Sequence, residues 1–164
     1  MAQPTRYDLL VLPRTYDRIT CSIARTMEVL GDRWTLLVVR NALVGMTRFD
    51  DFQQSLGIAP NVLADRLTRL CAEGVLQRRQ YSERPVRHDY VPTEKGRELW
   101  PLLAAMVTWG DAYYAPDGPP RLLLHGECGG PVVGQLTCTS CRSSVPPEDI
   151  ITGPGPGARP AVAA

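Results

Sequence analysis

Long apolar runs are missing from this 164-residue chain, and their absence removes whole classes of function. No run approaches the ~20 apolar residues that a membrane-spanning helix needs. The amino-terminal segment has no basic stretch followed by an apolar core, so we see no secretory signal peptide. We therefore expect a cytoplasmic protein with no membrane partner, in which cysteines serve as thiols or metal ligands rather than as structural disulfides.

Catalytic chemistry is also scarce. The chain has only two histidines and contains no G-x-S-x-G, H-E-x-x-H or phosphate-loop pattern. The "GPGPG" run near the carboxyl end lacks the strand-to-helix context of a dinucleotide-binding fingerprint. We therefore expect that the protein is not an enzyme.

Charge of either sign is not in excess. Eighteen basic residues oppose seventeen acidic ones, and the net charge of +1 argues neither for nor against nucleic acid. The length and the 44 % apolar content suggest one compact domain plus an appendage. We divide the chain into an amino-terminal arm (1–20), a main domain (21–115), an appendage (121–151) and a tail (152–164). The tail is rich in proline, glycine and alanine and should be disordered.

Helical periodicity dominates the first half of the main domain. We expect a first helix that starts at Ser22 and a second, apolar and central, that is capped by Asp32. The spacing predicts that one face of the first helix is buried. The residues of that face are Ile23, Met27 and Leu30.

Two further helices follow, joined by a short turn. Thr47 should cap the first of them, and Gly57 should end it. The next helix should start at Pro60, although Ala59 is a poor cap because it has no side-chain oxygen. Its leucines recur at helical spacing and should face the core. They are Leu63, Leu67 and Leu70.

The pattern after Gly74 changes to short extended runs. "VLQRRQY" and "HDYVPT" predict a hairpin, and "SERPVR" between them predicts a loop rather than a tight two-residue turn. Residues 94–114 return to helical spacing with Thr93 as the cap. Pro101 should start a second segment or produce a kink.

This order, two helices joined by a turn and then a hairpin, predicts a DNA-binding module. The second helix of a helix-turn-helix lies in the major groove, and its outer face here offers polar donors and acceptors. Residues 77–88 carry four arginines and one acid, which suits contacts with phosphates or a narrow minor groove. A surface helix beside a solvated hairpin would explain the second helix when it is taken by itself. The alternative is a protein-interaction module, in which the winged helix is only a scaffold and the carboxyl-terminal appendage binds a partner. Such a module would not need the basic hairpin.

The stretch from Cys21 to about Tyr113 resembles the HxlR family of bacterial winged-helix regulators. The motifs that carry the resemblance are "RFDDF", "GIAPNVLADRLTRLCAEG", "YSERPVRHDYVPTEKG" and the later "WG". The resemblance implies a mainly α winged helix-turn-helix with a small β wing. It also implies a homodimeric regulator of transcription that binds double-stranded DNA, with terminal helices forming the dimer. Such a dimer would recognise an inverted repeat.

The resemblance also assigns DNA contacts to this chain. Residues on the second helix of the motif would face the groove, while Arg48 and two wing arginines would reach phosphates or the minor groove. Ala59 departs from the Ser or Thr that this family often has there, which puts one cap and one phosphate contact in doubt. The predicted DNA-binding set is Arg48, Pro60, Asn61, Ala64, Asp65, Thr68, Arg69, Arg84 and Arg87.

Two isolated cysteines have separate explanations. Cys21 occupies a position at which some members of the family carry a redox-sensing thiol, and a helix amino terminus could lower its pKa. We expect instead that it is a packing residue, with redox regulation as the alternative. Cys71 lies among core-side residues of the predicted recognition helix and should also serve packing.

The remaining cysteines form a spaced set with one histidine. His125, Cys128, Cys138 and Cys141 give H-x2-C-x9-C-x2-C, a spacing that can place four ligands around structural zinc. An appendage of about 30 residues with few large apolar side chains also needs a staple. We favour a zinc-ribbon-like, β-rich appendage. Reduced thiols in a small hairpin and a disulfide between the two turns stay open.

A small-molecule effector is a further hypothesis. Aromatic residues near the long helix could line a pocket, although core and dimer packing is the simpler explanation for each of them. They are Trp34, Trp100, Trp109, Tyr113 and Tyr114. The sequence does not identify the effector, the operator or the direction of regulation.

Overall fold

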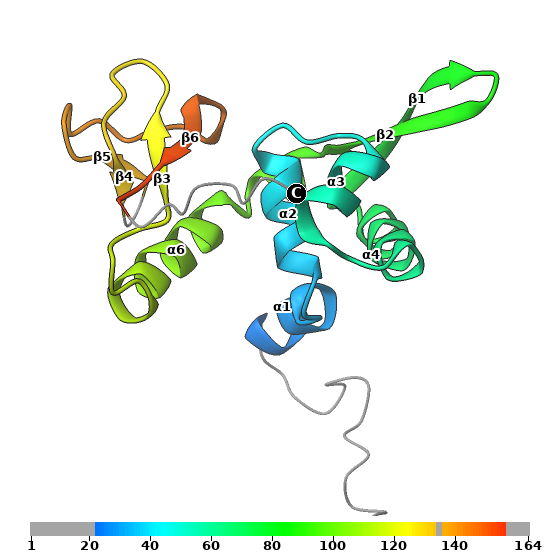
Figure 1. The fold of residues 1–164 in the computed structure, drawn as a ribbon, viewed down its shortest axis with the longest axis horizontal. Helices are drawn as coiled ribbons and strands as arrows, with labels where there is room; N and C mark the ends of the chain where they lie inside the picture. The colour runs from blue at the N-terminus through cyan, green and yellow to red at the C-terminus, as the bar shows by residue number, and fades with distance from the viewer. Residues whose placement is uncertain (1–21, 134–135, 157–164) are drawn as a thin grey trace, which may run out of the picture.

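A computed structural model of the chain describes residues 22–133 and 136–156. Figure 1 shows a helical body that carries a long hairpin on one side and a small β-rich unit on the other. One helix, α6 (Trp100–Tyr114), connects the two. The amino-terminal arm, Cys21 and residues 157–164 lie outside the described residues.

The helical body is built around an apolar central helix. α1 (Ser22–Leu30) precedes α2 (Thr35–Leu43), and α3 (Phe49–Leu56) follows. Val38 and Val39 of α2 are fully buried beside Phe52 of α3, which confirms the central position expected for the second helix. The apolar side chains of α2 therefore supply the middle of the core.

Two predicted caps are wrong. Trp34 and Arg48 occupy the N-cap positions of α2 and α3, and neither makes a side-chain capping bond. The carboxylate of Asp32 instead accepts a hydrogen bond from Arg66 at 2.6 Å. The carbonyl of Thr47 accepts one from the Tyr90 amide at 2.9 Å. At Asp32 a side-chain contact with a distant segment has therefore replaced the local cap.

The predicted buried stripe of α1 is also wrong. Ile23 is 73 % exposed and Met27 is 45 % exposed, while Leu30 alone of the three is buried. Ser22 is the first residue of the helix rather than its cap, and its carbonyl accepts a bond from the Thr26 hydroxyl. The reason is that α1 contacts the core only through its carboxyl-terminal end, which leaves the apolar side chains of its first turns facing solvent.

The helix that follows the turn agrees with the prediction. α4 (Pro60–Ala72) starts at Pro60, and Ala59 before it makes no side-chain capping bond. Gly57 ends α3 in the left-handed conformation, with φ of 60°, which glycine adopts without a steric penalty. The inner side chains of α4 are at most 1 % exposed. They are Leu63, Leu67 and Leu70.

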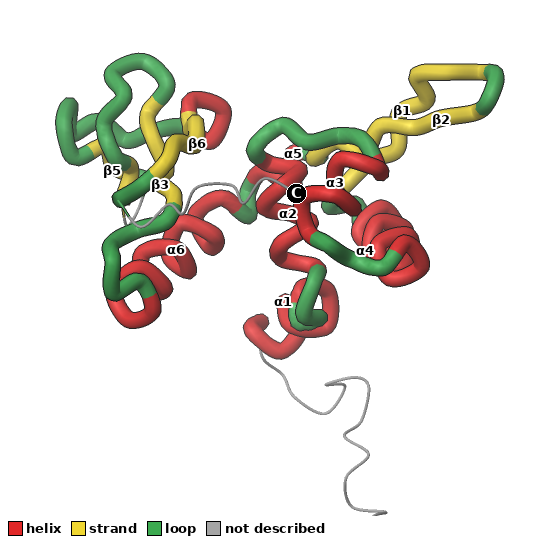
Figure 2. The backbone as a smooth tube through the Cα atoms, viewed as in Figure 1, coloured by secondary structure: helices red, strands yellow, loops and turns green. Residues whose placement is uncertain are grey.

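The hairpin, hereafter the wing, is longer and tighter than predicted. β1 (Leu76–Glu83) pairs antiparallel with β2 (Val86–Pro92), and Glu83 is the partner of Val86. Only Arg84 and Pro85 connect the strands, through a cis peptide bond, so the expected loop is wrong. The pairing register shifts at Tyr81. This bulge interrupts the alternation of inward and outward side chains from which a strand is predicted. Figure 2 shows the wing projecting away from the helices.

The predicted break in the last helical region is confirmed. α5 (Glu94–Arg97) is capped by Thr93, whose hydroxyl accepts a bond from the Gly96 amide at 3.1 Å. α6 begins as a second segment with Pro101 in its first turn, where a missing amide hydrogen costs nothing. Among the described residues, no helix is both long and apolar enough to cross a bilayer.

The appendage consists of short antiparallel pairs. β3 (Arg121–His125) pairs with β6 (Ile150–Pro154), and β4 (Val132–Val133) pairs with β5 (Thr137–Cys138). A 3-10 turn (Pro147–Asp149) precedes β6. Residues 152–154, which the composition assigned to a disordered tail, therefore belong to a paired strand. Backbone pairing with β3 is a long-range contact that composition does not reveal.

Two apolar clusters divide the molecule. The first lies in the helical body, and the second joins α6 to the appendage. Leu43 of α2 packs against both clusters, and α6 contributes Leu103 to the first and Trp100 to the second. The appendage is thus attached to the body through packed side chains as well as through the chain.

We predict opposite effects for two glycine substitutions. A Cβ at Gly96 would clash with the Val75 carbonyl, so Gly96→Ala should lower the free energy of unfolding by about 1–3 kcal/mol. Gly110 in α6 has nothing within 4 Å of its Cβ position, so Gly110→Ala should be neutral or stabilising by up to about 1 kcal/mol. Urea unfolding of both variants checks this. Equal stability of the two would contradict the close approach of α5 to Val75.

Candidate nucleic-acid interface and metal centre

The outer face of α4 presents the groove-facing residues that the sequence predicted. All of them are exposed, because the leucine stripe on the opposite face is buried and fixes the rotation of the helix. The exposed residues are Pro60, Asn61, Ala64, Asp65, Thr68 and Arg69. In Figure 1, α4 lies on the outside of the helical body, on the same side as the wing.

Two arginines connect α4 to the turn between α1 and α2. Arg66 and Arg69 donate to the same oxygen of Asp32, at 2.6 and 2.9 Å. Arg69 also donates to the Glu28 carbonyl of α1. Arg69 therefore faces α1 and α2 as well as solvent, and part of its hydrogen-bonding capacity serves the orientation of α4.

The tip of the wing carries cations. Arg84 and Arg87 are exposed, and neither forms a salt bridge with any residue in the described ranges. Nearer the base of the wing, Arg78 lies 3.1 Å from His88 Nδ1 and Arg79 lies 3.7 Å from Asp89. Positive charge is therefore least compensated where the wing extends farthest from the body.

Arg48 is held between the body and the wing. Its Nε lies 2.9 Å from Oδ1 of buried Asp89, and its guanidinium carbon lies 3.3 Å from the centre of the Tyr81 ring. The Nε contact is an ion pair without the alignment of a hydrogen bond. The sequence reasoning missed Asp89 and Tyr81. An aspartate inside a strand, where this residue type is depleted, was the signal that could have marked the site.

Apolar side chains remain exposed along α6. They recur at helical spacing on the face opposite Trp100 and Ala104, and we call this face the outer stripe. The outer stripe consists of Leu102, Met106, Trp109 and Tyr113. Together with Ile23 and Met27 of α1, it leaves more apolar surface exposed than scattered single residues would.

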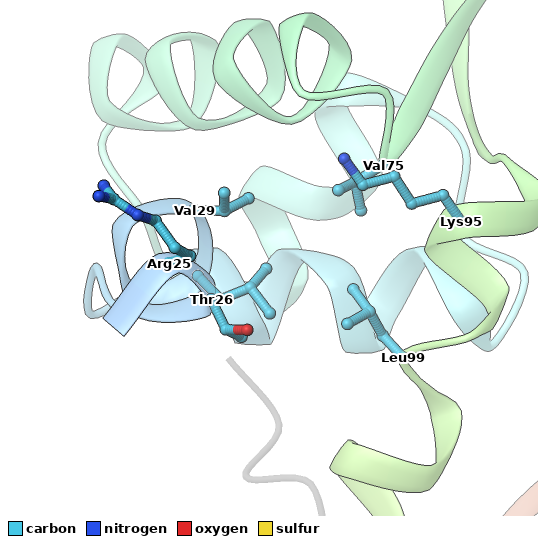
Figure 3. Close-up of a pocket in the computed structure, with 7 residues that line it drawn as sticks. Arg25, Thr26, Val29, Val75, Lys95 and Leu99 are labelled. Atoms are coloured by element: carbon cyan, nitrogen blue, oxygen red, sulfur yellow. The ribbon is translucent and has the colours of Figure 1, made fainter. Parts of the chain in front are cut away.

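The aromatic residues considered as effector-pocket walls lie in different surroundings. Trp100 is buried against the appendage, whereas Trp109 and Tyr113 are exposed and contact each other as a tilted pair, 5.5 Å between ring centres. A cavity of about 250 Å³ opens instead between α1 and α5 (Figure 3). Its walls are Arg25, Thr26, Val29, Leu30, Val75, Lys95 and Leu99.

The four predicted metal ligands meet in the appendage. The ligand atoms of His125, Cys128, Cys138 and Cys141 all lie within 4.8 Å of one another. Cys128 Sγ is 3.3 Å from His125 Nδ1, 3.3 Å from Cys138 Sγ and 3.8 Å from Cys141 Sγ. Zinc bonds of about 2.3 Å to sulfur and about 2.0 Å to nitrogen place tetrahedral neighbours roughly 3.5–3.8 Å apart. The cluster could therefore hold a metal ion.

The two halves of the cluster share one backbone conformation. The Gly129 amide donates to the His125 carbonyl at 2.8 Å, and the Arg142 amide donates to the Cys138 carbonyl at 2.9 Å. Gly129 and Arg142 both have positive φ, 67° and 59°. Each x2 spacing thus forms the same knuckle, a similarity that only the structure reveals.

The surroundings of the cluster suit a metal. His125 turns Nδ1 toward the sulfurs, while its Nε2 lies 3.9 Å from Glu127 and 4.0 Å from Asp149. The two carboxylates are beyond hydrogen-bonding distance of the ring, and they place negative charge beside the cluster. Hydrogen bonds from Ser143 lower the pKa of Cys141 to about 6, which favours the thiolate.

The other cysteines are accounted for separately. The three cysteines of the cluster and Cys71 are free thiols, so the inter-knuckle disulfide does not form here. Cys71 packs against the helical core, as predicted, and burial raises the pKa of its thiol. Cys21 lies outside the described residues.

Comparisons with known proteins agree with this geometry. An uncharacterized HTH-type transcriptional regulator of Mycobacterium tuberculosis is 39 % identical over 83 % of this chain and 87 % of its own length. The crystal structure of PA1607, described as a candidate transcription factor, is similar at a TM-score of 0.66 and 40 % identity, over 81 % of this chain and 94 % of that one. The reduced form of the redox regulator HypR is similar at a TM-score of 0.54 and 29 % identity, over 56 % and 92 %.

The family model described as HxlR-like helix-turn-helix matches residues 29–118, from the end of α1 through the wing and α6. The resemblance drawn from the sequence motifs and the winged helix-turn-helix fold are both confirmed. The chain belongs to the HxlR-like helix-turn-helix family, and it is a transcriptional regulator of the HTH type.

Proposed function

We propose that the protein is a homodimeric regulator that binds an inverted-repeat operator with one α4 helix in the major groove of each half-site. The observation that carries this proposal is the division of α4 into a fully buried leucine face and an exposed polar face, beside a wing tipped with arginine. A helix held in this way can enter a groove without giving up its contacts with the core.

The proposed DNA contacts are of two kinds, contacts with base edges and contacts with phosphates. Asn61 and Thr68 carry donors and acceptors that match base edges, while Pro60, Ala64 and Asp65 complete the surface that faces the groove. Arg84 and Arg87 would contact phosphates or the minor groove. Arg48 and Arg69 are each about two-fifths exposed, with side-chain exposures of 43 % and 42 %. They would contact phosphate with their remaining donors while Asp89 and Asp32 fix their positions.

The proposed dimer is supported by apolar surface. The outer stripe of α6 and the exposed residues of α1 would be costly to leave in water, and a second copy offers the same surface in return. A two-fold axis through this contact would set the two α4 helices about one helical turn of DNA apart, or a multiple of that distance. Such a regulator would act in the cytoplasm, where its DNA lies.

We further propose a structural zinc ion at His125, Cys128, Cys138 and Cys141. Zinc is favoured by the mixed thiolate and imidazole donors, the near-tetrahedral distances and the two equivalent knuckles. Four protein ligands leave no open coordination position, so this ion would stabilise structure rather than perform catalysis.

Thiol oxidation at Cys21 is a second candidate mode of regulation. The similarity to HypR, a redox regulator, favours it. Cys21 immediately precedes α1 in the sequence, and α1 carries Ile23 and Met27, which are proposed for the dimer.

We predict distinct effects of substitutions on α4 and the wing, measured on an operator selected from a random DNA pool. Arg87→Ala should weaken binding to all sequences and reduce the slope of log affinity against log salt by about 0.9 per lost phosphate contact. Asn61→Ala should relax specificity at one or two positions, at a cost of about 1–3 kcal/mol. Arg121→Ala, in the appendage, should change neither. Binding that is equally tight in 50 and 200 mM salt would refute the proposal.

The dimer proposal predicts that Met106→Glu raises the dimer dissociation constant at least ~10-fold, because an unpaired charge would enter an apolar contact. Ala112→Glu places the same charge on α6 outside the outer stripe and should leave the constant nearly unchanged. Sedimentation equilibrium provides the measurement. A monomeric wild-type protein that binds a single asymmetric half-site would rule out the dimer.

The metal proposal predicts about one zinc ion per chain in protein purified without chelator. Cys141→Ser should abolish stoichiometric zinc, since loss of one thiolate removes most of the affinity, whereas Cys71→Ser should retain it. Elemental analysis by mass spectrometry distinguishes the two variants. Wild-type protein without zinc would leave the appendage as a plain thiol-containing hairpin.

A further inference from the structure

α6 presents three different faces to three different surroundings. Leu103 packs into the helical body, whereas Trp100 and Ala104 are 2 % and 1 % exposed against the appendage. The outer stripe lies on the remaining side. The orientation of the outer stripe is therefore set jointly by the body and by the appendage.

The cluster that covers the inner face of α6 includes one of the proposed metal ligands. Cys138 is fully buried, and it belongs to the same apolar cluster as Trp100. The other appendage members of that cluster are Val132, Leu136, Val145 and Ile150. The metal centre and the surface that holds α6 are thus two sides of one small core.

Few backbone pairings hold this small core together. β3 and β6 pair over five residues, whereas β4 and β5 pair over only two residues each. A Cβ at Gly130 would lie 2.6 Å from Cys138 Sγ, so the backbone of one knuckle rests directly on the sulfur of the other. A unit of fewer than about 40 residues usually needs a metal or a disulfide to stay folded. The bonds from a metal would therefore supply a large part of what keeps this core closed.

We propose that operator binding by this protein is conditional on a zinc-class metal ion, which closes the appendage on α6 and thereby orients the outer stripe for the second copy. This inference rests on the proposed dimeric DNA-binding function and names its effector. A soft divalent ion is the ligand class that three thiolates and an imidazole select.

The coupling has a direct thermodynamic basis. The four ligands converge only when both knuckles are folded, so the metal binds the closed appendage in preference to an open one. The closed appendage buries Trp100 and also contacts Leu43 of α2. Metal binding therefore favours one placement of α6 relative to the body, and with it one distance between the α4 helices of the dimer.

The test uses the full-length protein and an operator selected with zinc-loaded wild type. Cys128→Ser removes an exposed ligand and should lose zinc, weaken the dimer and raise the Kd for the operator at least ~10-fold. Cys71→Ser, a cysteine outside the cluster, should match wild type in all three measurements. Wild type stripped with a chelator should behave like Cys128→Ser and recover when zinc alone is restored.

A second variant separates the coupling from the ligands. Trp100→Ala leaves all four ligands in place but removes the largest contact between the cluster and α6. This variant should weaken both the dimer and operator binding. Because linkage between two binding events is reciprocal, it should also lower the affinity for zinc, measured by competition with a chelator. As a control, far-ultraviolet circular dichroism checks that the helical body of the variant remains folded.

The outcomes distinguish this inference from the proposed function. Zinc loss in Cys128→Ser with unchanged dimer and operator affinity would overturn the metal dependence and leave the DNA-binding proposal intact. Unchanged zinc and operator affinity in Trp100→Ala would overturn the coupling through α6. Failure of zinc-loaded wild type to select any operator would overturn the proposed function itself.

Discussion

Burial of the leucine face of α4 is the contact on which the rest of the interface depends. Leu63, Leu67 and Leu70 are almost completely excluded from water, against a core centred on Val38 and Phe52. Each such side chain contributes roughly 1.5–3 kcal/mol when it is fully buried. A rotation of α4 about its axis would expose them, so the polar face has only one direction in which to point.

Buried or partly buried acids add a second level of orientation. Asp32 holds two arginines of α4 against the turn before α2, and Asp89 holds Arg48 between α3 and the wing. The first tethers α4 and the second tethers the wing, each to the helical body, and both neutralise cations close to the body. Net positive charge is left at the wing tip, on Arg84 and Arg87, where a phosphate could be approached with little desolvation.

α6 links the three functions that we assign to the molecule. Its inner face closes the apolar cluster of the appendage, Leu103 anchors it to the body, and the outer stripe is available to a second copy. A helix packed on two sides moves as a rigid element, because tightly packed side chains do not deform continuously. A chemical event in the appendage could therefore reach the dimer contact that we propose without passing through the DNA-binding helices.

The sequence by itself determined the elements with strong local signals. The leucine spacing of α4, the start at Pro60, the Thr93 cap and the break at Pro101 were all readable, because each depends on residues a few positions apart. The two x2 pairs of the appendage were readable for the same reason, whereas their convergence on one point needed the fold. Only the tertiary structure decided which of several local options was used. Asp32 binds α4 instead of capping α2, and Ile23 faces solvent although its spacing suits a buried face. The wing continues past the bulge at Tyr81, and residues 152–154 form a strand. Each of these choices depends on a partner far away in the chain, and local periodicity carries no information about that partner.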